Sequence, residues 1–150
     1  MEQRSVPMAA LAPLLEEIVS RGGSVELTAT GHSMEPMLRD RESRVRLAAP
    51  RRLRRGDLAL YQRGDGGYVL HRVIAVRADG LLCCGDAQTV PERVAPGQVR
   101  AVAVAFTDRQ GRWRSVSEAR CRAYWQLRLA SRPLRRGLIA LHRMLRGGAT

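Results

Sequence analysis

The hydrophobic period of the chain changes at residue 24, and this change limits the fold more than any other feature. Between residues 24 and 116, short stretches either alternate apolar with polar side chains or are continuously apolar, and turn-forming residues separate them. A period of two is typical of strands that bury one face. Asp79-Gly80, between two such stretches, is typical of a hairpin turn. The pattern predicts a β-rich body with strands over residues 24–30, 44–47, 57–61, 68–76, 81–84, 99–106 and 113–116.

Helical periods flank this body. Four apolar residues of the first segment, residues 6–21, recur at the spacing of one helix face, and Gly22-Gly23 follows as a stop signal. These four are Leu11, Leu14, Leu15 and Ile18. Two further helical stretches, residues 118–131 and 134–145, follow the body. The expected fold class is mainly β: an N-terminal amphipathic helix in residues 1–23, a β-rich domain in residues 24–116, and a basic helical tail in residues 117–150.

The positive charge of the chain is concentrated in that tail. All 26 basic residues are Arg, against 14 acidic residues, and the formal net charge is +12. Residues 109–150 hold 11 of the Arg and one acid, Glu118, so residues 1–108, with 15 Arg and 13 acids, are nearly neutral. A basic tail suits an anionic membrane surface or an acidic partner. Packing of the tail on the body is an equal alternative. Nucleic acid is not the expected partner, because residues 1–108 carry little net charge.

The sequence gives little indication of a membrane span, a disulfide framework or a cofactor. The longest apolar run covers residues 8–15, whereas a spanning helix needs about 20 residues. Cys83, Cys84 and Cys121 are odd in number and lack the paired spacing of a zinc site, so buried free thiols are expected. We therefore expect a cytoplasmic protein without a metal or cofactor, and a peripheral membrane location stays an open alternative.

Five short motifs, which follow one another along the chain, carry the information about chemistry. Residues 31–38 (GHSMEPML) follow the expected strand over residues 24–30, so Ser33 comes shortly after a strand. Alone, a serine there is most often a turn residue. Four further motifs follow it at ordered intervals, in residues 55–61 (RGDLALY), 69–74 (VLHRVI), 85–88 (GDAQ) and 96–99 (PGQV).

These five motifs resemble the signal-peptidase-like serine proteases, the group that joins type I signal peptidases with self-cleaving repressors of the LexA type. The resemblance covers about residues 29–105. It implies a signal-peptidase/LexA-like β-rich catalytic domain in which Ser33 is the nucleophile. It also implies an extended peptide or precursor protein as substrate, cut after small residues such as Ala.

The family divides by its general base, which is Lys in the bacterial type and His in the archaeal and endoplasmic-reticulum type. This chain has no Lys and carries His71 in the matching motif. Arg72 cannot serve, because a guanidinium keeps its proton in proteins. An imidazole titrates near neutral pH and can accept a proton. The resemblance therefore implies a Ser33/His71 pair. His32 is a weaker candidate, because neighbouring side chains on a strand point to opposite faces.

The resemblance supplies two carboxylates for the third position, Asp86 and Glu92. A carboxylate that accepts a hydrogen bond from the second imidazole nitrogen fixes the tautomer and stabilises the imidazolium. We favour Asp86 as the closer match to the family motif. The family has Asp where this chain has Glu92, and Pro91 replaces a common neighbouring acid.

The nucleophile motif also implies an oxyanion hole and a supporting turn. The backbone N–H of Ser33 is the expected donor, and Gly31 stands where many bacterial members place a second, hydroxyl donor. Met34 is expected to pack in the core, and Pro36 to hold the turn.

The expected function is a serine endopeptidase that removes a leader or signal segment from a precursor. The alternative is a non-catalytic binding module of the same fold, whose tail binds an acidic partner, a lipid surface or nucleic acid. A self-cleaving repressor is weaker, because only about 23 residues precede the body, fewer than a DNA-binding helix-turn-helix domain needs.

Overall fold

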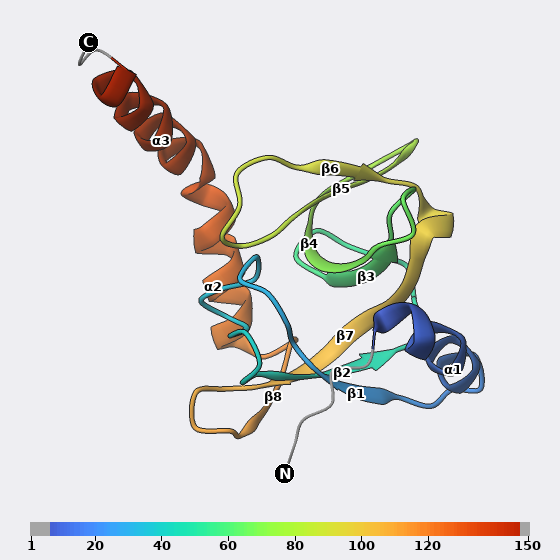
Figure 1. Ribbon diagram of the computed structural model, residues 1–150. Coiled ribbons are helices and arrows are strands. Elements are labelled where there is room, and N and C mark those ends of the chain that lie inside the picture. Colours follow the sequence, from blue (N-terminus) through green and yellow to red (C-terminus); the bar gives the residue numbers. More distant parts are fainter. Residues whose placement is uncertain (1–6, 148–150) are drawn as a thin grey trace.

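An antiparallel sheet of eight strands forms the body of the protein (Figure 1). The computed structural model describes residues 7–147. The strand order is β1-β2-β7-β3-β4-β5-β6, and β8 pairs with β7. The strands are β1 (Val25–Thr28), β2 (Arg44–Ala48), β3 (Leu58–Gln62), β4 (Tyr68–Arg77), β5 (Gly80–Cys84), β6 (Glu92–Val94), β7 (Val99–Thr107) and β8 (Trp113–Ser115).

The mainly-β prediction is confirmed, and seven of the eight strands overlap the stretches expected from the sequence. The missed strand is β6. It has only three residues, lies between Pro91 and Pro96, and shows no hydrophobic alternation of its own. It forms because β5 offers pairing partners, Leu81 opposite Val94 and Cys83 opposite Glu92. Tertiary pairing here overrides a weak local signal.

Three helices complete the structure: α1 (Met8–Ser20), α2 (Ala119–Ala130) and α3 (Arg132–Gly147). The predicted start of the first helix, Val6, lies outside the described residues. α1 buries Leu15 and Val19 against the larger core. α2 and α3 are separated at Ser131 rather than at the expected Arg132-Pro133. Pro133 lies in the first turn of α3, where proline costs no hydrogen bond.

Strand β4 separates two buried polar groups. Successive side chains of a strand point to opposite faces, so His71 and Arg72 face different sides of the sheet. Both are almost fully buried, with 2% and 1% of their surface exposed. The two faces at this point therefore have separate polar partners, and the candidate site lies on the His71 side.

The cysteines and the helices carry two further findings. All three cysteines are free and buried, as expected. Within residues 7–147, no helix combines the length and apolar character that crossing a bilayer requires.

Candidate active site

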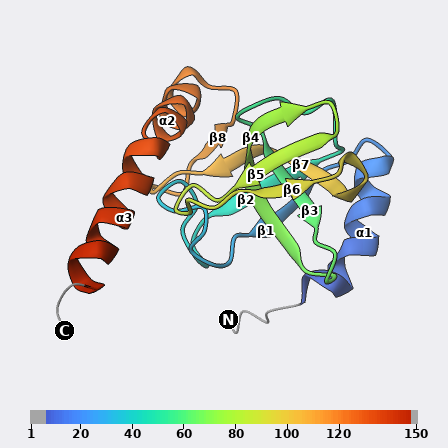
Figure 2. The ribbon, with the colours of Figure 1, turned by 90° about the horizontal axis from the view of Figure 1, so that it is seen from above.

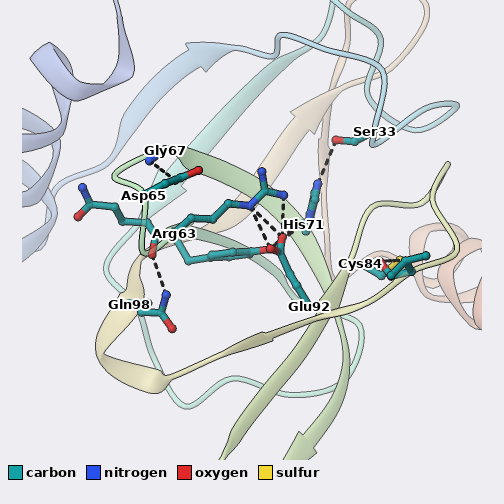
Figure 3. A network of polar contacts seen from close by, with 11 residues as sticks. Ser33, Arg63, Asp65, Gly67, His71, Cys84, Glu92 and Gln98 are labelled. Atoms are coloured by element: carbon teal, nitrogen blue, oxygen red, sulfur yellow. Dashed lines mark hydrogen bonds and ion pairs between the residues drawn. The ribbon is translucent and has the colours of Figure 1, made fainter.

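Ser33 and His71, which are 38 residues apart in sequence, lie within hydrogen-bond distance of one another (Figure 3). Ser33 lies in the turn that follows β1, and His71 lies in the middle of β4. The distance from His71 Nε2 to Ser33 Oγ is 3.2 Å. This is the geometry in which an imidazole can accept the proton of a serine hydroxyl.

The other imidazole nitrogen faces Tyr61 and Glu92. His71 Nδ1 lies 3.2 Å from the Tyr61 hydroxyl and 3.4 Å from Glu92 Oε1. The Tyr61 hydroxyl donates a short hydrogen bond to the same carboxylate oxygen. Arg63 adds two charge-assisted hydrogen bonds to Glu92, of 2.9 Å to Oε1 and 3.0 Å to Oε2. Figure 3 shows the Glu92 carboxylate against the Arg63 guanidinium, with His71 beside them.

These contacts assign the tautomer of His71. Burial opposes ionisation of Glu92, but hydrogen bonds from Arg63 and Tyr61 and the charge of Arg63 outweigh it and lower its pKa. The carboxylate is therefore ionised at neutral pH and can only accept. The Tyr61 hydroxyl consequently donates its hydrogen bond to Glu92 and can only accept one from His71. The proton of the neutral imidazole then lies on Nδ1, and Nε2 presents its lone pair to Ser33.

Burial and charge shift the pKa values of the site in the direction that a general base needs. Burial is the main cause that lowers the pKa of His71, and the charge of Glu92 partly opposes it. The imidazole is therefore neutral at pH 7 and available as a base. Burial and the neighbouring Glu92 raise the pKa of Tyr61, which keeps its hydroxyl protonated.

Asp86 does not lie beside His71, the position that the family resemblance favoured for it. Its carboxylate is buried and forms two hydrogen bonds with Arg72, of 2.7 and 2.9 Å, and it accepts a third from Tyr124 at 3.0 Å. The reason is the strand period, which directs Arg72 to the face opposite His71. Glu92, rather than Asp86, is the carboxylate beside Nδ1 of His71.

The loop of Asp86 nevertheless supports Ser33. The N–H of Ala87 donates to the backbone carbonyl of Ser33 at 2.9 Å. A Cβ added at Gly85 would lie 2.5 Å from that same carbonyl oxygen, so only glycine allows this approach. The loop therefore contributes to the position of Ser33 through its backbone.

The turn that carries Ser33 leaves one amide available. Within residues 7–147, the N–H of Ser33 has no protein acceptor, which suits a donor to a developing oxyanion. Gly31 has a positive φ of 87°, offers no side chain, and donates its own N–H to Asp40 at 2.7 Å. Met34 is buried in the larger core, and Pro36 lies in the same turn, whose Leu38 N–H donates to the Met34 carbonyl.

His32 has different surroundings from His71. It lies in an exposed turn, not on a strand, and its Nδ1 is 2.8 Å from Glu35 while Nε2 is 3.8 Å from Asp40. These contacts direct the ring toward acidic side chains at the surface.

Sequence reasoning missed Tyr61 and Arg63. The signal that could have found Tyr61 is the pairing of β3 with β4, in which Ala59 lies opposite His71. Tyr61, two residues further along β3, then shares the face of His71 as a diagonal neighbour. Arg63 follows the end of β3 on the same side, close enough to reach Glu92.

No protein-family model, no curated protein and no solved structure matches the chain. In the described part of the chain, no cluster of three or more His, Cys, Asp or Glu side chains could hold a metal ion.

The hydroxyl of Tyr61 is expected to contribute to activity. Replacing Tyr61 with Phe keeps the ring but removes the acceptor for Nδ1 and a donor to Glu92. Hydrogen bonds to charged groups contribute about 1.5–3 kcal/mol, so we expect kcat/KM for peptide cleavage to fall by roughly 10- to 100-fold. Tyr68→Phe, at a partly buried position, is the matched control. Equal rates in Tyr61→Phe and the control would exclude this role.

Proposed function

We propose that the protein is a serine endopeptidase of the signal-peptidase-like type, with Ser33 as nucleophile and His71 as general base. One observation supports this most strongly: Nε2 of His71 faces Ser33 Oγ at 3.2 Å while Nδ1 faces the Tyr61–Glu92 pair. We propose likewise that its sheet forms a signal-peptidase/LexA-like catalytic domain. This assignment rests on the five motifs and on the antiparallel sheet that carries them.

The reaction follows the usual course of acyl transfer. Ser33 Oγ attacks the scissile carbonyl carbon as its proton passes to Nε2 of His71. The charge on the carbonyl oxygen is met by the free N–H of Ser33. The carbon–nitrogen bond breaks, and His71 returns the proton to the leaving amine. A water molecule then attacks the Ser33 ester and gives its proton to His71. The acid is released, and the proton passes from His71 to Ser33 Oγ.

Glu92 and Tyr61 act through His71. The imidazolium that forms during each attack keeps its Nδ1 proton directed at these two groups, and the negative charge of Glu92 stabilises it. Arg63 holds Glu92 in place. This assignment gives Glu92 the orienting role and leaves Asp86 with a structural one.

An extended peptide is the substrate that the sheet suits best. Within residues 7–147, β1 pairs with β2 alone and leads directly into the Ser33 turn, so its second edge is open to an added strand. Main-chain hydrogen bonds along an edge provide affinity without a sequence requirement. The resemblance adds a preference for small residues before the cut. A leader or signal segment of a precursor protein, processed in the cytoplasm, is the natural form of such a substrate.

The pH dependence of cleavage tests these roles. Protonated His71 cannot act as a base, so kcat/KM is expected to fall with decreasing pH, with a midpoint below the ordinary histidine pKa of about 6.5. In Glu92→Gln, the loss of a charge that raises the pKa of His71 should move the midpoint further toward acid and lower the maximal rate.

The matched control is Glu42→Gln, which removes an exposed carboxylate paired with Arg39. Its profile should coincide with that of the unaltered protein. A midpoint that stays in place in Glu92→Gln, with the maximal rate retained, would contradict the orienting role of Glu92.

A further inference from the structure

The apolar face of α3 has no partner in the described structure. Helix α3 has 16 residues, and all residues from 136 to 147 are exposed. Its large apolar side chains recur at intervals of three or four residues and therefore form one stripe along the helix. Each has at least 53% of its surface exposed: Leu134, Leu138, Leu141, Met144 and Leu145.

The remaining surface of α3 is strongly basic. It carries five Arg and one His, and no acidic residue occurs between residues 119 and 150. Arg136, Arg143 and Arg146 form no ion pair within residues 7–147. Ile139 is the one large apolar residue on this basic side. A contiguous exposed apolar stripe of this kind marks an interaction surface, and the unpaired Arg beside it favour a negatively charged one.

The first turn of α3 is fixed to the body by its basic side. Arg132 donates to the Thr89 carbonyl at 2.7 Å, and Arg135 donates to the Asp86 carbonyl at 2.8 Å. Residues of a helix advance by about 100° each, so Arg132 lies roughly opposite the stripe of Leu134, Leu138 and Leu141. Arg135 lies at the side of that stripe. Figures 1 and 2 show α3 projecting from the sheet beyond α2. The apolar stripe therefore points away from the body and can meet a flat surface.

We infer that α3 is a membrane-surface helix whose apolar stripe enters the headgroup region of a bilayer rich in anionic lipid. A leucine-rich stripe with an Arg-rich opposite face is the composition of helices that lie in this interface. The guanidinium groups of Arg136, Arg143 and Arg146 can bind lipid phosphates in a bidentate manner, while the long side chains reach up from the edges of the stripe.

Charge favours a bilayer over a second copy of the chain. Two α3 helices paired through their stripes would bring ten Arg together without an acid on either helix to offset them. An anionic bilayer instead supplies the opposite charge across the whole length of the helix, about 1 kcal/mol for each basic residue near the surface.

This inference does not depend on the proposed protease function. Two hydrogen bonds nevertheless connect α3 with the candidate site. Arg135 donates to the Asp86 carbonyl, and the N–H of the adjacent Ala87 donates to the Ser33 carbonyl. Membrane attachment through α3 would therefore place the Ser33 turn close to the bilayer.

Vesicle flotation of the full chain tests the apolar stripe. The probes are vesicles of phosphatidylcholine alone and vesicles with a third of that lipid replaced by phosphatidylglycerol. We expect binding to the anionic vesicles and little to the neutral ones. The double variant Leu138→Glu/Leu141→Glu should lose binding. The matched control Leu14→Glu/Val76→Glu changes two equally exposed apolar residues of α1 and β4 and should keep it.

A second pair of variants tests the charge. Arg136→Gln/Arg143→Gln should lower the partition coefficient for anionic vesicles by about 30-fold. Arg77→Gln/Arg109→Gln removes the same charge from the body and should have a much smaller effect. Circular dichroism confirms that each variant is folded.

Three results would overturn the inference. One is equal binding to neutral and anionic vesicles. Another is binding that both leucine changes leave intact. The third is failure of the unaltered chain to float, together with self-association that the same leucine changes abolish, which would make a second copy the occupant of the stripe.

Discussion

Replacing Asp86 with Ala is expected to destabilise the protein by about 3–5 kcal/mol. The Asp86 carboxylate is buried against the Arg72 guanidinium, which has only 1% of its surface exposed. Removing the carboxylate leaves a buried cation with two weaker, uncharged acceptors, the Gly56 carbonyl at 2.8 Å and Met37 Sδ at 3.0 Å. It also leaves the Tyr124 hydroxyl without its partner. A loss of this size is a large part of the 5–15 kcal/mol that keeps a domain folded.

Urea unfolding of the full chain, followed by circular dichroism, measures the effect. The control Asp79→Ala removes an exposed carboxylate that lies 3.8 Å from Arg93, and its free energy of unfolding should change by less than about 0.5 kcal/mol. Asp86→Asn, which keeps the shape and part of the hydrogen bonding, should fall between the two. Unchanged stability together with lost peptide cleavage in Asp86→Asn would return Asp86 to the orienting role and contradict the structural assignment.

Removing Ser33, His71 or both is expected to lower kcat for peptide cleavage by the same large factor, at least about 10³. The two groups act as one unit, because the base has no function without the hydroxyl it deprotonates, and the hydroxyl is a poor nucleophile without the base. The double variant Ser33→Ala/His71→Ala should therefore be no worse than either single variant.

The matched controls are Ser20→Ala, on α1, and His142→Ala, on α3, which make the same chemical changes at exposed positions. Single-turnover cleavage with purified protein separates the chemical step from product release. Additive losses in the double variant would show that Ser33 and His71 do not act on one proton, and would argue against the proposed pair.

The β-rich body was predictable because its strands are long enough to show their own period. β4 and β7 carry runs of apolar residues, and the predicted strands there match the observed bounds to within one residue. β6 was not predictable, since its three residues pair with β5 only after the chain has folded. The local sequence pattern shows only the conformation that a segment favours on its own. The three residues of β6 show no such local preference for a strand.

The candidate site was predictable only in part. The motifs singled out Ser33 and His71, and the structure brings these two together. The choice between Asp86 and Glu92 depended on which face of β4 each carboxylate meets, and spacing along the chain does not contain that information. Tyr61 was missed because its role comes from cross-strand pairing with the neighbourhood of His71, not from a motif of its own.

The contacts of the tail were also not predictable from the sequence alone. Its helical period and its Arg content were clear in the sequence, but packing on the body and attachment to a membrane were equal alternatives. In the structure, neighbouring segments of the tail differ in their contacts with the body. Arg128 of α2 and Arg132 and Arg135 at the start of α3 bind backbone carbonyls of the body, whereas residues 136–147 extend away from it.

The most direct test of the central claim is mass spectrometry of a pool of extended precursor peptides incubated with the unaltered protein and with Ser33→Ala. Detergent and anionic lipid are included as variables. The account predicts cleavage at defined bonds after small residues by the unaltered protein, and none by a folded Ser33→Ala variant. Cleavage at the same bonds and the same rate by Ser33→Ala would contradict it, because Ser33 would then not be the nucleophile.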